Sequence, residues 1–313
     1  MEVIHKKFKP HSLTGDWALL IGNFDGVHLG HQTLIRRLLE AQARMGGKAG
    51  VLTFEPHPKI LLQPHIPFPH IYEEDVKWRL LAETGLDACF VVPFTPAFAS
   101  LQPEEFLNKL FGFVALKYLI VGWDFNFGKD RQGGAALLGE EAARRGVEFV
   151  QMPPVKEAGL TVSSTMIRRL LFEGDFDLAE RLLGRPWQIS GIVTQGRQLG
   201  RQLGFPTLNL FPQVLLPLRH GVYLSEVQVL GQTAQAVTNI GVAPTLGGPP
   251  LLKVESHLFD FGATAYGQEA IVRPLCFLRE EQKFNSLEEL KTQIALDVAQ
   301  AKGIFARWQL GKG

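Results

Sequence analysis

The stretch "WALLIGNFDGVHLGHQTLIRRLLEAQARMG" (residues 17–46) decides the fold of the first half of the chain. Its first part, residues 17–24, is an apolar run bounded by Gly and Asp, which indicates a buried strand. From His31 onward, apolar side chains recur at helical spacing up to Gly46, which indicates an amphipathic helix. The glycines that let the backbone turn at this junction are Gly22, Gly26 and Gly30. The stretch therefore predicts a strand–turn–helix unit of an α/β sheet.

The rest of the first half alternates between the same two patterns. Four more apolar runs, interpreted as buried strands, are residues 48–54, 87–94, 117–122 and 147–152. Helical patterns lie between and after them, at residues 73–85, 103–116, 133–146, 163–174 and 175–184. Strands that alternate with helices predict a doubly wound parallel sheet with right-handed crossovers.

The second half of the chain has short strand-like stretches separated by Gly, Pro and Asn turns. These stretches are residues 187–196, 221–229, 233–242, 252–261 and 268–277. An amphipathic helix follows at residues 286–303, with Ser286 as N-cap and Glu289 completing a capping box. This order predicts a small antiparallel β-barrel with a terminal helix. The chain is thus predicted to be an α/β protein with two domains, residues 1–184 and 185–313.

The composition is typical of a globular protein, with 313 residues of which 46% are hydrophobic and 20% charged. A formal net charge of +1 argues against a broad surface for nucleic acid or membrane, so neither is predicted as a partner. Cys89 and Cys276 stand in separate apolar runs without zinc or CxxC spacing, which favours the reducing cytoplasm. No cleavable leader and no membrane-spanning segment is predicted. A homo-oligomer is left open.

Two histidines, His28 and His31, fall at the predicted start of the first helix. Backbone N–H groups and the helix dipole favour negative charge there, so the imidazoles could donate hydrogen bonds to phosphate oxygens. Zinc is one alternative, with His57 as a third ligand, although carboxylate-rich ligand spacing is missing. A helix cap or a surface position is the other alternative. The glycines around the pair favour the phosphate interpretation.

Two further stretches suit phosphate binding. "VSSTMIRR" (162–169) has three hydroxyl groups at a predicted helix start and two arginines in the first turns. "GIVTQGRQLGRQLGFPTLNL" (191–210) has glycines at steps of four and two arginines; it holds neither a Walker A nor a GxGxxG motif. A glycine-rich loop with arginines can still cradle phosphates, and a turn-rich barrel corner is the alternative. Thr207 and Asn209 would face one side of a strand and offer neutral oxygens to Mg²⁺.

The motifs of the first half resemble those of the nucleotidylyltransferases, a superfamily with a Rossmann-like fold. His28 and His31 form its HxGH signature. Residues 162–169 resemble the (I/V)SSTxIR signature of the bacterial flavin adenylyltransferases, and "TFEPHP" (53–58) and "VGWDFNFG" (121–128) resemble other motifs of that branch.

Residues 191–210 resemble the riboflavin kinase signature GxxxGRxLGFPTxN. The stretches that resemble the rest of that family, in order, are residues 239–248, 254–261 and 277–290. Over nearly its whole length the chain is therefore similar to the bifunctional bacterial riboflavin kinase/FAD synthetases.

This resemblance implies that the second domain phosphorylates riboflavin to FMN with ATP. Glu255 would accept the proton of the ribityl 5′-hydroxyl, and Arg279 would contact flavin or phosphate. The residues expected to bind ATP are Gly196, Arg197, Gly200, Gly204, Pro206, Thr207 and Asn209, of which Thr207 and Asn209 would hold Mg²⁺.

The resemblance also implies that the first domain joins FMN to ATP, forming FAD and releasing pyrophosphate. His28, His31 and Arg168 would carry the catalysis. The residues expected to bind ATP there are Gly22, Phe24, Asp25, Gly26, His28, His31, Ser163, Ser164, Thr165 and Arg168. Those expected to bind the flavin are Phe54, Pro56, His57, Asp124 and Phe127.

The sequence departs from the family pattern at four positions. Leu208 and Leu246 are apolar replacements that should not remove chemistry. Met166 stands where many relatives carry arginine, and Asp124 stands where some have asparagine. The contacts most affected are a secondary phosphate contact and a contact to the flavin ring.

Two other functions compete with this interpretation. A tRNA-charging enzyme shares the HxGH signature, but the chain has no KMSKS-type loop and no strongly basic region. Alternatively, a single-activity FMN adenylyltransferase could carry a non-catalytic flavin-binding barrel. A possible metal and base set in PTLN and VES disfavours that alternative, because binding alone does not need one.

Overall fold

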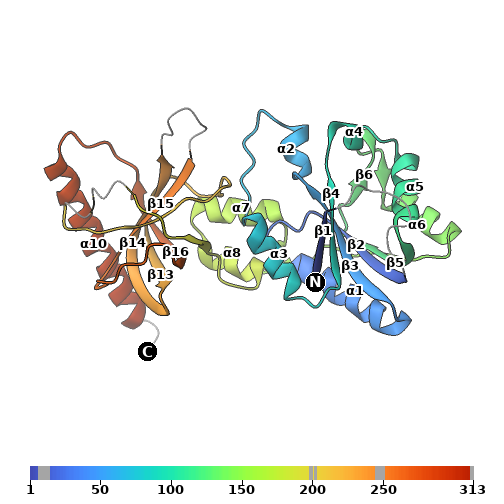
Figure 1. The fold of residues 1–313 in the computed structure, drawn as a ribbon, viewed down its shortest axis with the longest axis horizontal. Helices are drawn as coiled ribbons and strands as arrows, with labels where there is room; N and C mark the ends of the chain where they lie inside the picture. Colours follow the sequence, from blue (N-terminus) through green and yellow to red (C-terminus); the bar gives the residue numbers. More distant parts are fainter. Residues whose placement is uncertain (6–14, 197–199, 201–202, 244–250, 311–313) are drawn as a thin grey trace. The chain divides into compact units, whose positions relative to one another are not determined.

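The computed structural model describes residues 1–5, 15–196, 200, 203–243 and 251–310 (Figure 1). The chain divides into two compact units, Met1–Met166 and Ile167–Gly313. The predictions for Arg197, Arg201 and Leu246 lie outside the described residues.

The first unit is built on the predicted parallel sheet, which has six strands because β1 joins the five that the sequence indicates. Its strands, in spatial order, are β1 (Glu2–His5), β4 (Ala88–Pro93), β3 (Lys48–Glu55), β2 (Asp16–Ile21), β5 (Ala115–Val121) and β8 (Glu148–Gln151). Strand β2 is buried on both faces: Leu19 and Ile21 belong to one core cluster, and Ala18 and Leu20 to the other. Such double burial explains why this strand is a continuous apolar run. The edge strand β8 is only partly buried.

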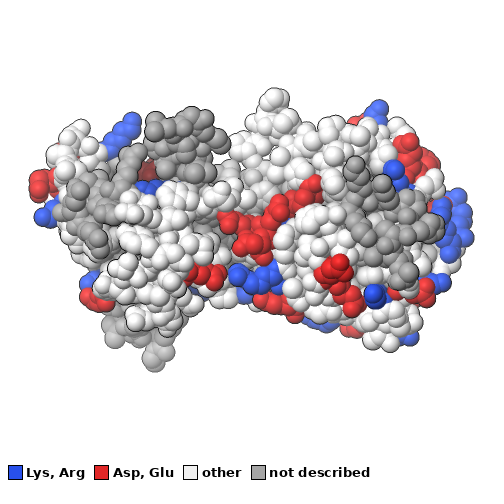
Figure 2. All heavy atoms as spheres, viewed as in Figure 1, with Lys and Arg blue, Asp and Glu red and all other residues white. Residues whose placement is uncertain are grey.

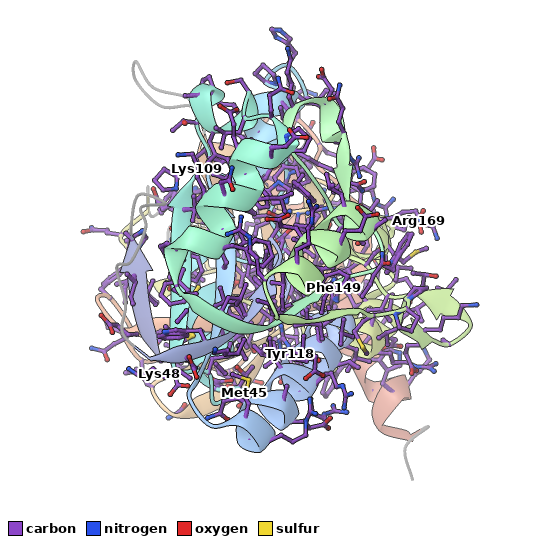
Figure 3. All side chains as sticks on the ribbon, turned by 90° about the vertical axis from the view of Figure 1, so that its right-hand side faces the viewer. Met45, Lys48, Lys109, Tyr118, Phe149 and Arg169 are labelled. Atoms are coloured by element: carbon purple, nitrogen blue, oxygen red, sulfur yellow. The ribbon has the colours of Figure 1, made fainter. Side chains whose placement is uncertain are left out.

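Helices cover both faces of this sheet (Figure 1). On one side are α1 (Leu29–Met45) and α3 (Glu74–Ala82); on the other are α5 (Pro103–Phe113) and α6 (Ala135–Arg144). Figure 3 looks onto the α5 and α6 side, with Met45 and Lys48 marking the amino end of β3. The shorter elements are α2 (Pro58–Leu62), α4 (Pro96–Ala99), η1 (Lys129–Arg131) and the strand pairs β6 (Asn126–Phe127) with β7 (Gly133–Gly134) and β9 (Lys156–Glu157) with β10 (Leu160–Thr161).

The strand order places a switch point between β2 and β5. From β2 the chain continues through β3 to β4 on one side, and then crosses to β5 and β8 on the other. In sheets of this kind, ligands bind outside the carboxyl ends of the strands at the switch point. The segments that follow those ends include α2, α4 and β6, which lie together in Figure 1.

The second unit holds the predicted antiparallel barrel. Its strands, in spatial order, are β11 (Ile189–Ile192), β16 (Glu269–Glu280), β13 (Gly221–Val229), β14 (Gln232–Ala243), β15 (Leu251–Leu258) and β12 (Leu208–Leu210). An antiparallel bridge between Thr194 and Asn209 joins the two ends of this sheet, so the barrel is nearly closed. Inside it, the hydroxyls of Thr238 and Ser256 are 2.9 Å apart and fully buried.

The terminal helix α10 (Leu287–Leu310) packs through Ala301 against Val222 and Leu224 of the barrel. Its start differs slightly from the predicted capping box. Ser286 Oγ accepts a hydrogen bond from the Glu289 N–H at 3.1 Å, but the Glu289 carboxylate accepts from the N–H of Asn285, at 2.8 Å. The reciprocal bond is therefore made one residue earlier than in the standard box.

Helices α7 (Ser164–Glu173) and α8 (Phe176–Leu183) lie between the sheet and the barrel in sequence. Within the second unit, Arg273 of β16 donates two hydrogen bonds to the Glu180 carboxylate of α8, at 3.0 and 2.5 Å. The Trp187 N–H also donates to Glu180 Oε1, at 3.1 Å. These contacts attach α8 to the barrel, and the domain boundary between residues 184 and 185 stays a prediction.

Replacing Glu180 by glutamine is expected to lower the free energy of unfolding of the second unit by about 2 kcal/mol, because the Arg273 charge loses a largely buried partner. Urea unfolding would measure this. The matched control is Glu40→Gln, which breaks an exposed pair with Arg37 and should cost below about 0.5 kcal/mol. Equal effects of the two substitutions would contradict the anchoring role of Glu180.

Leu230→Asn is expected to stabilise the second unit by about 1 kcal/mol. Leu230 and Gly231 are the two corner residues of the β13–β14 hairpin, with φ of +53° and +73°. Leucine is strained in this left-handed region, whereas asparagine tolerates it. Urea unfolding of Leu230→Asn beside Leu230→Ala checks the cause. Alanine keeps the backbone strain at position 230. A similar gain in the free energy of unfolding from Leu230→Ala would therefore assign the effect to the loss of an exposed apolar side chain.

Candidate active sites

The two histidines of the first unit lie against each other at the start of α1. Their rings are stacked, with centroids 3.7 Å apart and planes at 15°. His28 is the N-cap of the helix: its Nδ1 accepts a hydrogen bond from the His31 N–H at 3.3 Å. This bond requires an unprotonated Nδ1, so in the neutral ring the proton is on Nε2. One alternative from the sequence, a helix cap, therefore holds for His28, and the cap also fixes the orientation of its ring.

Glycines keep the loop before α1 close to these rings. A Cβ at Gly30 would lie 3.0 Å from the His28 ring, and one at Gly22 would lie 3.2 Å from the Phe24 ring. Gly26 has φ of +86°, and Phe24 and Val27 also have positive φ. The loop thus depends on small residues and an unusual backbone, as a close-fitting ligand loop does.

The second predicted phosphate motif meets the first one. Ser164 Oγ donates a hydrogen bond of 2.8 Å to the backbone carbonyl of Asp25, whose carboxylate accepts one of 3.0 Å from the Ile71 N–H. Ser163 Oγ accepts from the Met166 N–H at 3.2 Å, so it caps the start of α7. Thr165 is exposed and Arg168, one turn along α7, is half-buried. The amino end of α7 is therefore held at the loop that precedes α1, an arrangement that favours anions.

The residues predicted to bind flavin fall into two groups. Phe54 and Phe127 are buried, 9% and 6% exposed, and a chain of ring contacts links them through Phe98 and Phe106. These two linking rings are not apparent from the sequence motifs, because they come from α4 and α5. The prediction that Phe127 stacks on a flavin is not tested by this packing.

Pro56 and Asp124 are exposed, whereas His57 is buried. His57 Nδ1 accepts a hydrogen bond from the Lys59 N–H at 3.2 Å. The His57 ring stacks on the Phe68 ring, with centroids 4.2 Å apart. In the described part of the chain, no group of three His, Cys, Asp or Glu side chains is placed to hold a metal ion.

A buried ion pair beside this region was not predicted. Lys77 of α3, 7% exposed, bonds to Glu55 at the carboxyl end of β3. Burial raises the pKa of Glu55, and the Lys77 ammonium opposes that rise. The pair fixes the residue that precedes Pro56, and no local sequence signal connects residues 22 positions apart.

The candidate kinase residues lie on one row across the barrel. Register pairs Asn209 with Glu255, Glu255 with Asn239, Asn239 with Val222, and Val222 with Arg279. Directly paired residues share a face of a sheet, so this row faces the same side as Val222, which contacts α10. Three strand spacings of ~4.8 Å separate Arg279 from Glu255 by about 14 Å.

A pocket opens at the Asn209 end of this row. Its lining includes Gly196, Pro206, Thr207 and Asn209, with a second wall from Phe261 and residues 263–266. Asn209 is 3% exposed, and among described residues its Oδ1 has no hydrogen-bond partner. Thr207 precedes β12 rather than lying in it. A buried, unpaired neutral oxygen beside a pocket fits a Mg²⁺ ligand.

The other predicted residues of the glycine-rich stretch shape its turns. Gly200 accepts a hydrogen bond from the Phe205 N–H at 2.7 Å, and a Cβ there would lie 2.4 Å from the Phe205 carbonyl oxygen. Gly204 has φ of +89°. A Cβ at Gly196 would lie 2.7 Å from the Asn209 amide. Gly200 and Gly204 therefore need glycine for backbone reasons, whereas Gly196 leaves room for the Asn209 side chain.

Two charged residues beside Glu255 were missed in the sequence. Lys253 Nζ lies 2.6 Å from Glu255 Oε1. Lys253 is paired in register with Gly241, where a Cβ would collide with the Glu281 carboxylate. Glu281 Oε1 also accepts a hydrogen bond from Asn239 Nδ2 at 3.3 Å. The candidate base thus lies in a cluster of two carboxylates, one ammonium and two amides.

Arg279 makes a different contact from the one predicted for it. Its guanidinium donates two hydrogen bonds to Asp297 of α10, at 2.8 and 2.7 Å, and Asp297 is 2% exposed. This bidentate pair attaches α10 to β16. Contact between Arg279 and flavin or phosphate stays a prediction.

Charge on the visible face gives no sign of a polyanion surface. Figure 2 shows the described Lys and Arg side chains spread among Asp and Glu rather than gathered in one broad area. None of the helices in the described part of the chain is long and apolar enough to cross a membrane.

Comparison with known proteins assigns each half of the chain to a family. A family model described as FAD synthetase matches residues 11–166, and one described as riboflavin kinase matches residues 183–305. A "Bifunctional riboflavin kinase/FMN adenylyltransferase" of Pseudomonas fluorescens is 41% identical over 91% of this chain and 92% of its own. This chain belongs to the bifunctional riboflavin kinase/FMN adenylyltransferase family.

A further relative and a solved structure are similar to this chain over nearly its whole length. The protein of that name from Escherichia coli K12 is 38% identical over 92% of both chains. A solved structure titled "Crystal Structure of Macrolide-efflux Protein from Streptococcus pneumoniae" has a TM-score of 0.79 and 31% identity, and covers 96% of this chain and 99% of its own. That structure carries the same fold along nearly the whole chain.

Proposed function

We propose that this protein makes FAD from riboflavin in two ATP-dependent steps. The second unit phosphorylates riboflavin to FMN, and the first transfers an adenylyl group from ATP to FMN and releases pyrophosphate. The observation that supports two activities is the register pairing of Asn209, which lines a pocket, with Glu255 on the neighbouring strand. A barrel that only binds flavin, the single-activity alternative, needs no base next to a metal ligand.

In the kinase reaction, the ribityl 5′-hydroxyl attacks the γ-phosphorus of ATP and ADP leaves. Glu255 accepts the hydroxyl proton, because the neutral hydroxyl is a poor nucleophile. Asn209 Oδ1 and Thr207 would hold Mg²⁺, which neutralises the phosphate charge when bound. Gly196 and Pro206 line the pocket proposed for ATP. Gly200, Gly204 and Arg197 belong to the same sequence motif and would also contact ATP. Arg279, about 14 Å from Glu255, suits the far end of the flavin better than the phosphate.

In the adenylyl transfer, the FMN phosphate attacks the α-phosphorus of ATP. This nucleophile is already an anion, so positioning and charge stabilisation supply the rate. His28 and His31 would donate to the triphosphate, with Gly22, Phe24, Asp25 and Gly26 forming the loop around it. Ser163, Ser164, Thr165 and Arg168 would hold the departing pyrophosphate at the start of α7. The flavin would lie against Phe54, Pro56, His57, Asp124 and Phe127.

We assign the adenylyltransferase to residues 1–184 and the kinase to residues 185–313. The partners are small molecules, riboflavin, FMN and ATP, and the setting is the cytoplasm. A homo-oligomer is compatible with this proposal and is not required by it.

Product analysis tests the proposal directly. Purified protein incubated with riboflavin, ATP and Mg²⁺ should form FMN first and FAD second, as separated by liquid chromatography. FMN without FAD would remove the assignment of the first unit. Flavin binding without any product, from folded protein, would favour a binding module and overturn the kinase assignment.

A further inference from the structure

Trp123 is the exposed aromatic residue of the loop that follows β5. Its side chain is 49% exposed, whereas Phe127 in the same loop is 6% exposed. The Phe127 ring packs on Phe106, with centroids 4.8 Å apart, and a Cβ at Gly133 would lie 2.5 Å from it. Phe127 therefore packs in the core and Phe125 is partly buried, so Trp123 is the most exposed ring of this segment.

Trp123 lies at the switch point of the sheet. Ile21 is the last residue of β2 and is paired in register with Val121, the last residue of β5, so both strands end at the same edge of the sheet. Asn23 lies two residues after Ile21, in the loop that leads to His28. Trp123 lies two residues after Val121. The indole is thus carried by the strand adjacent to the one that carries the phosphate loop, where ligands of such sheets bind.

The backbone that carries Trp123 is held in place. The Phe125 N–H donates to the Gly122 carbonyl at 3.3 Å, so Trp123 and Asp124 are the corner residues of a turn. Gln151 Nε2 of β8 donates to the Trp123 carbonyl at 2.9 Å, and Asn126 Nδ2 donates to the Asp124 carbonyl at 2.7 Å. A ring on a fixed backbone loses little freedom when a ligand covers it.

The flavin fits this ring better than adenine does. The predicted flavin residue Pro56 is exposed and follows β3, and Trp123 follows β5, so β2 lies between them. Two strand spacings are about 10 Å. A three-ring isoalloxazine is long enough to approach both groups, whereas the two-ring adenine is shorter. The indole is also electron-rich, which favours offset stacking on the electron-poor flavin.

We propose that Trp123 stacks on the isoalloxazine ring of FMN in the adenylyltransferase site and sets the affinity for that substrate. This proposal rests on the proposed function. Asp124, the next corner residue, is exposed beside it and would accept a hydrogen bond from the ring's N–H edge. Trp123 would act in substrate binding and take no part in the transfer itself.

The test compares Trp123→Leu and Trp123→Phe in the full chain, with FMN and ATP as substrates. The KM for FMN should rise about tenfold with leucine and less with phenylalanine, while kcat and the KM for ATP stay within about twofold. An unchanged kcat and KM for ATP report that the first unit is folded, and riboflavin phosphorylation in the same samples reports on the second unit. The matched control is Trp308→Leu, which removes a 41% exposed tryptophan from α10 and should change none of these constants.

Three outcomes decide the matter. An unchanged KM for FMN overturns the proposal, and a raised KM for ATP overturns it by assigning the ring to adenine. Wild-type protein that forms no FAD contradicts the proposed function instead. In that case an FMN binding titration, monitored by flavin fluorescence, still tests the role of Trp123. An equal Kd for FMN in wild type and Trp123→Leu would overturn that role.

Discussion

His28→Ala is expected to reduce FAD formation from FMN to a small residual rate while riboflavin phosphorylation in the same chain stays within about twofold of wild type. The ring is fixed by the N-cap bond to the His31 N–H and by stacking on His31. A fixed donor aimed at developing phosphate charge typically contributes 10²–10³-fold, so kcat should fall by about that factor. Separate assays with riboflavin and with FMN would measure the two activities.

His28→Ala also removes the helix N-cap, so loss of stability must be separated from loss of the imidazole as a hydrogen-bond donor. Removing a capping side chain costs about 1 kcal/mol of stability. Asparagine also caps helices well, so His28→Asn should restore stability but not FAD formation. Recovery of activity in His28→Asn would assign the role of His28 to capping alone. Equal loss of both activities in folded His28→Ala protein would contradict the two-site assignment.

The fold could be predicted where burial leaves a strong local pattern. The strand β2 is buried on both faces, so its residues form a continuous apolar run. The edge strand β1 was missed because it has four residues, of which only Ile4 is buried, and it gains its structure by pairing with β4. Such pairing over long sequence distance leaves no local signal.

The candidate sites show the same limit. His28, Ser164 and Asn209 stand in contiguous motifs, so the sequence alone is enough to propose them as candidates. Lys253 contacts Glu255, and Glu281 contacts Asn239, the register partner of Glu255. The Glu281 contact needs the space left by glycine at position 241. Neither residue type nor spacing indicates these contacts, because they depend on which strands become neighbours.

Arg279 shows how a side chain's partner depends on the packed structure. The sequence places it after a strand and suggests a contact with ligand. In the structure its guanidinium bonds to Asp297, 18 residues later on α10, and the contact with ligand stays a prediction. Only the packing of the helix on the barrel creates that pair. A buried carboxylate on the helix is a strong competitor for any ligand oxygen.

Glu255→Gln is expected to lower kcat for riboflavin phosphorylation by about 10²–10⁴-fold, the usual contribution of a general base. Glutamine keeps the shape of the side chain but cannot accept the hydroxyl proton. FAD formation from added FMN should stay within about twofold of wild type, because that reaction belongs to the other unit. The measurement is the rate of FMN formation at saturating riboflavin and ATP, beside the rate of FAD formation from FMN.

The matched control is Glu226→Gln, which changes a strand glutamate of the same barrel outside the row from Asn209 to Arg279. It should leave both rates unchanged. A second comparison separates proton transfer from charge: Glu255→Gln also leaves the Lys253 ammonium, 2.6 Å away, without its partner. If that lost pair were the cause, Lys253→Met combined with Glu255→Gln would recover activity, because no unpaired charge would remain. If Glu255 is the base, the double variant stays as inactive as Glu255→Gln, since no group at this position can then take the proton from the ribityl hydroxyl.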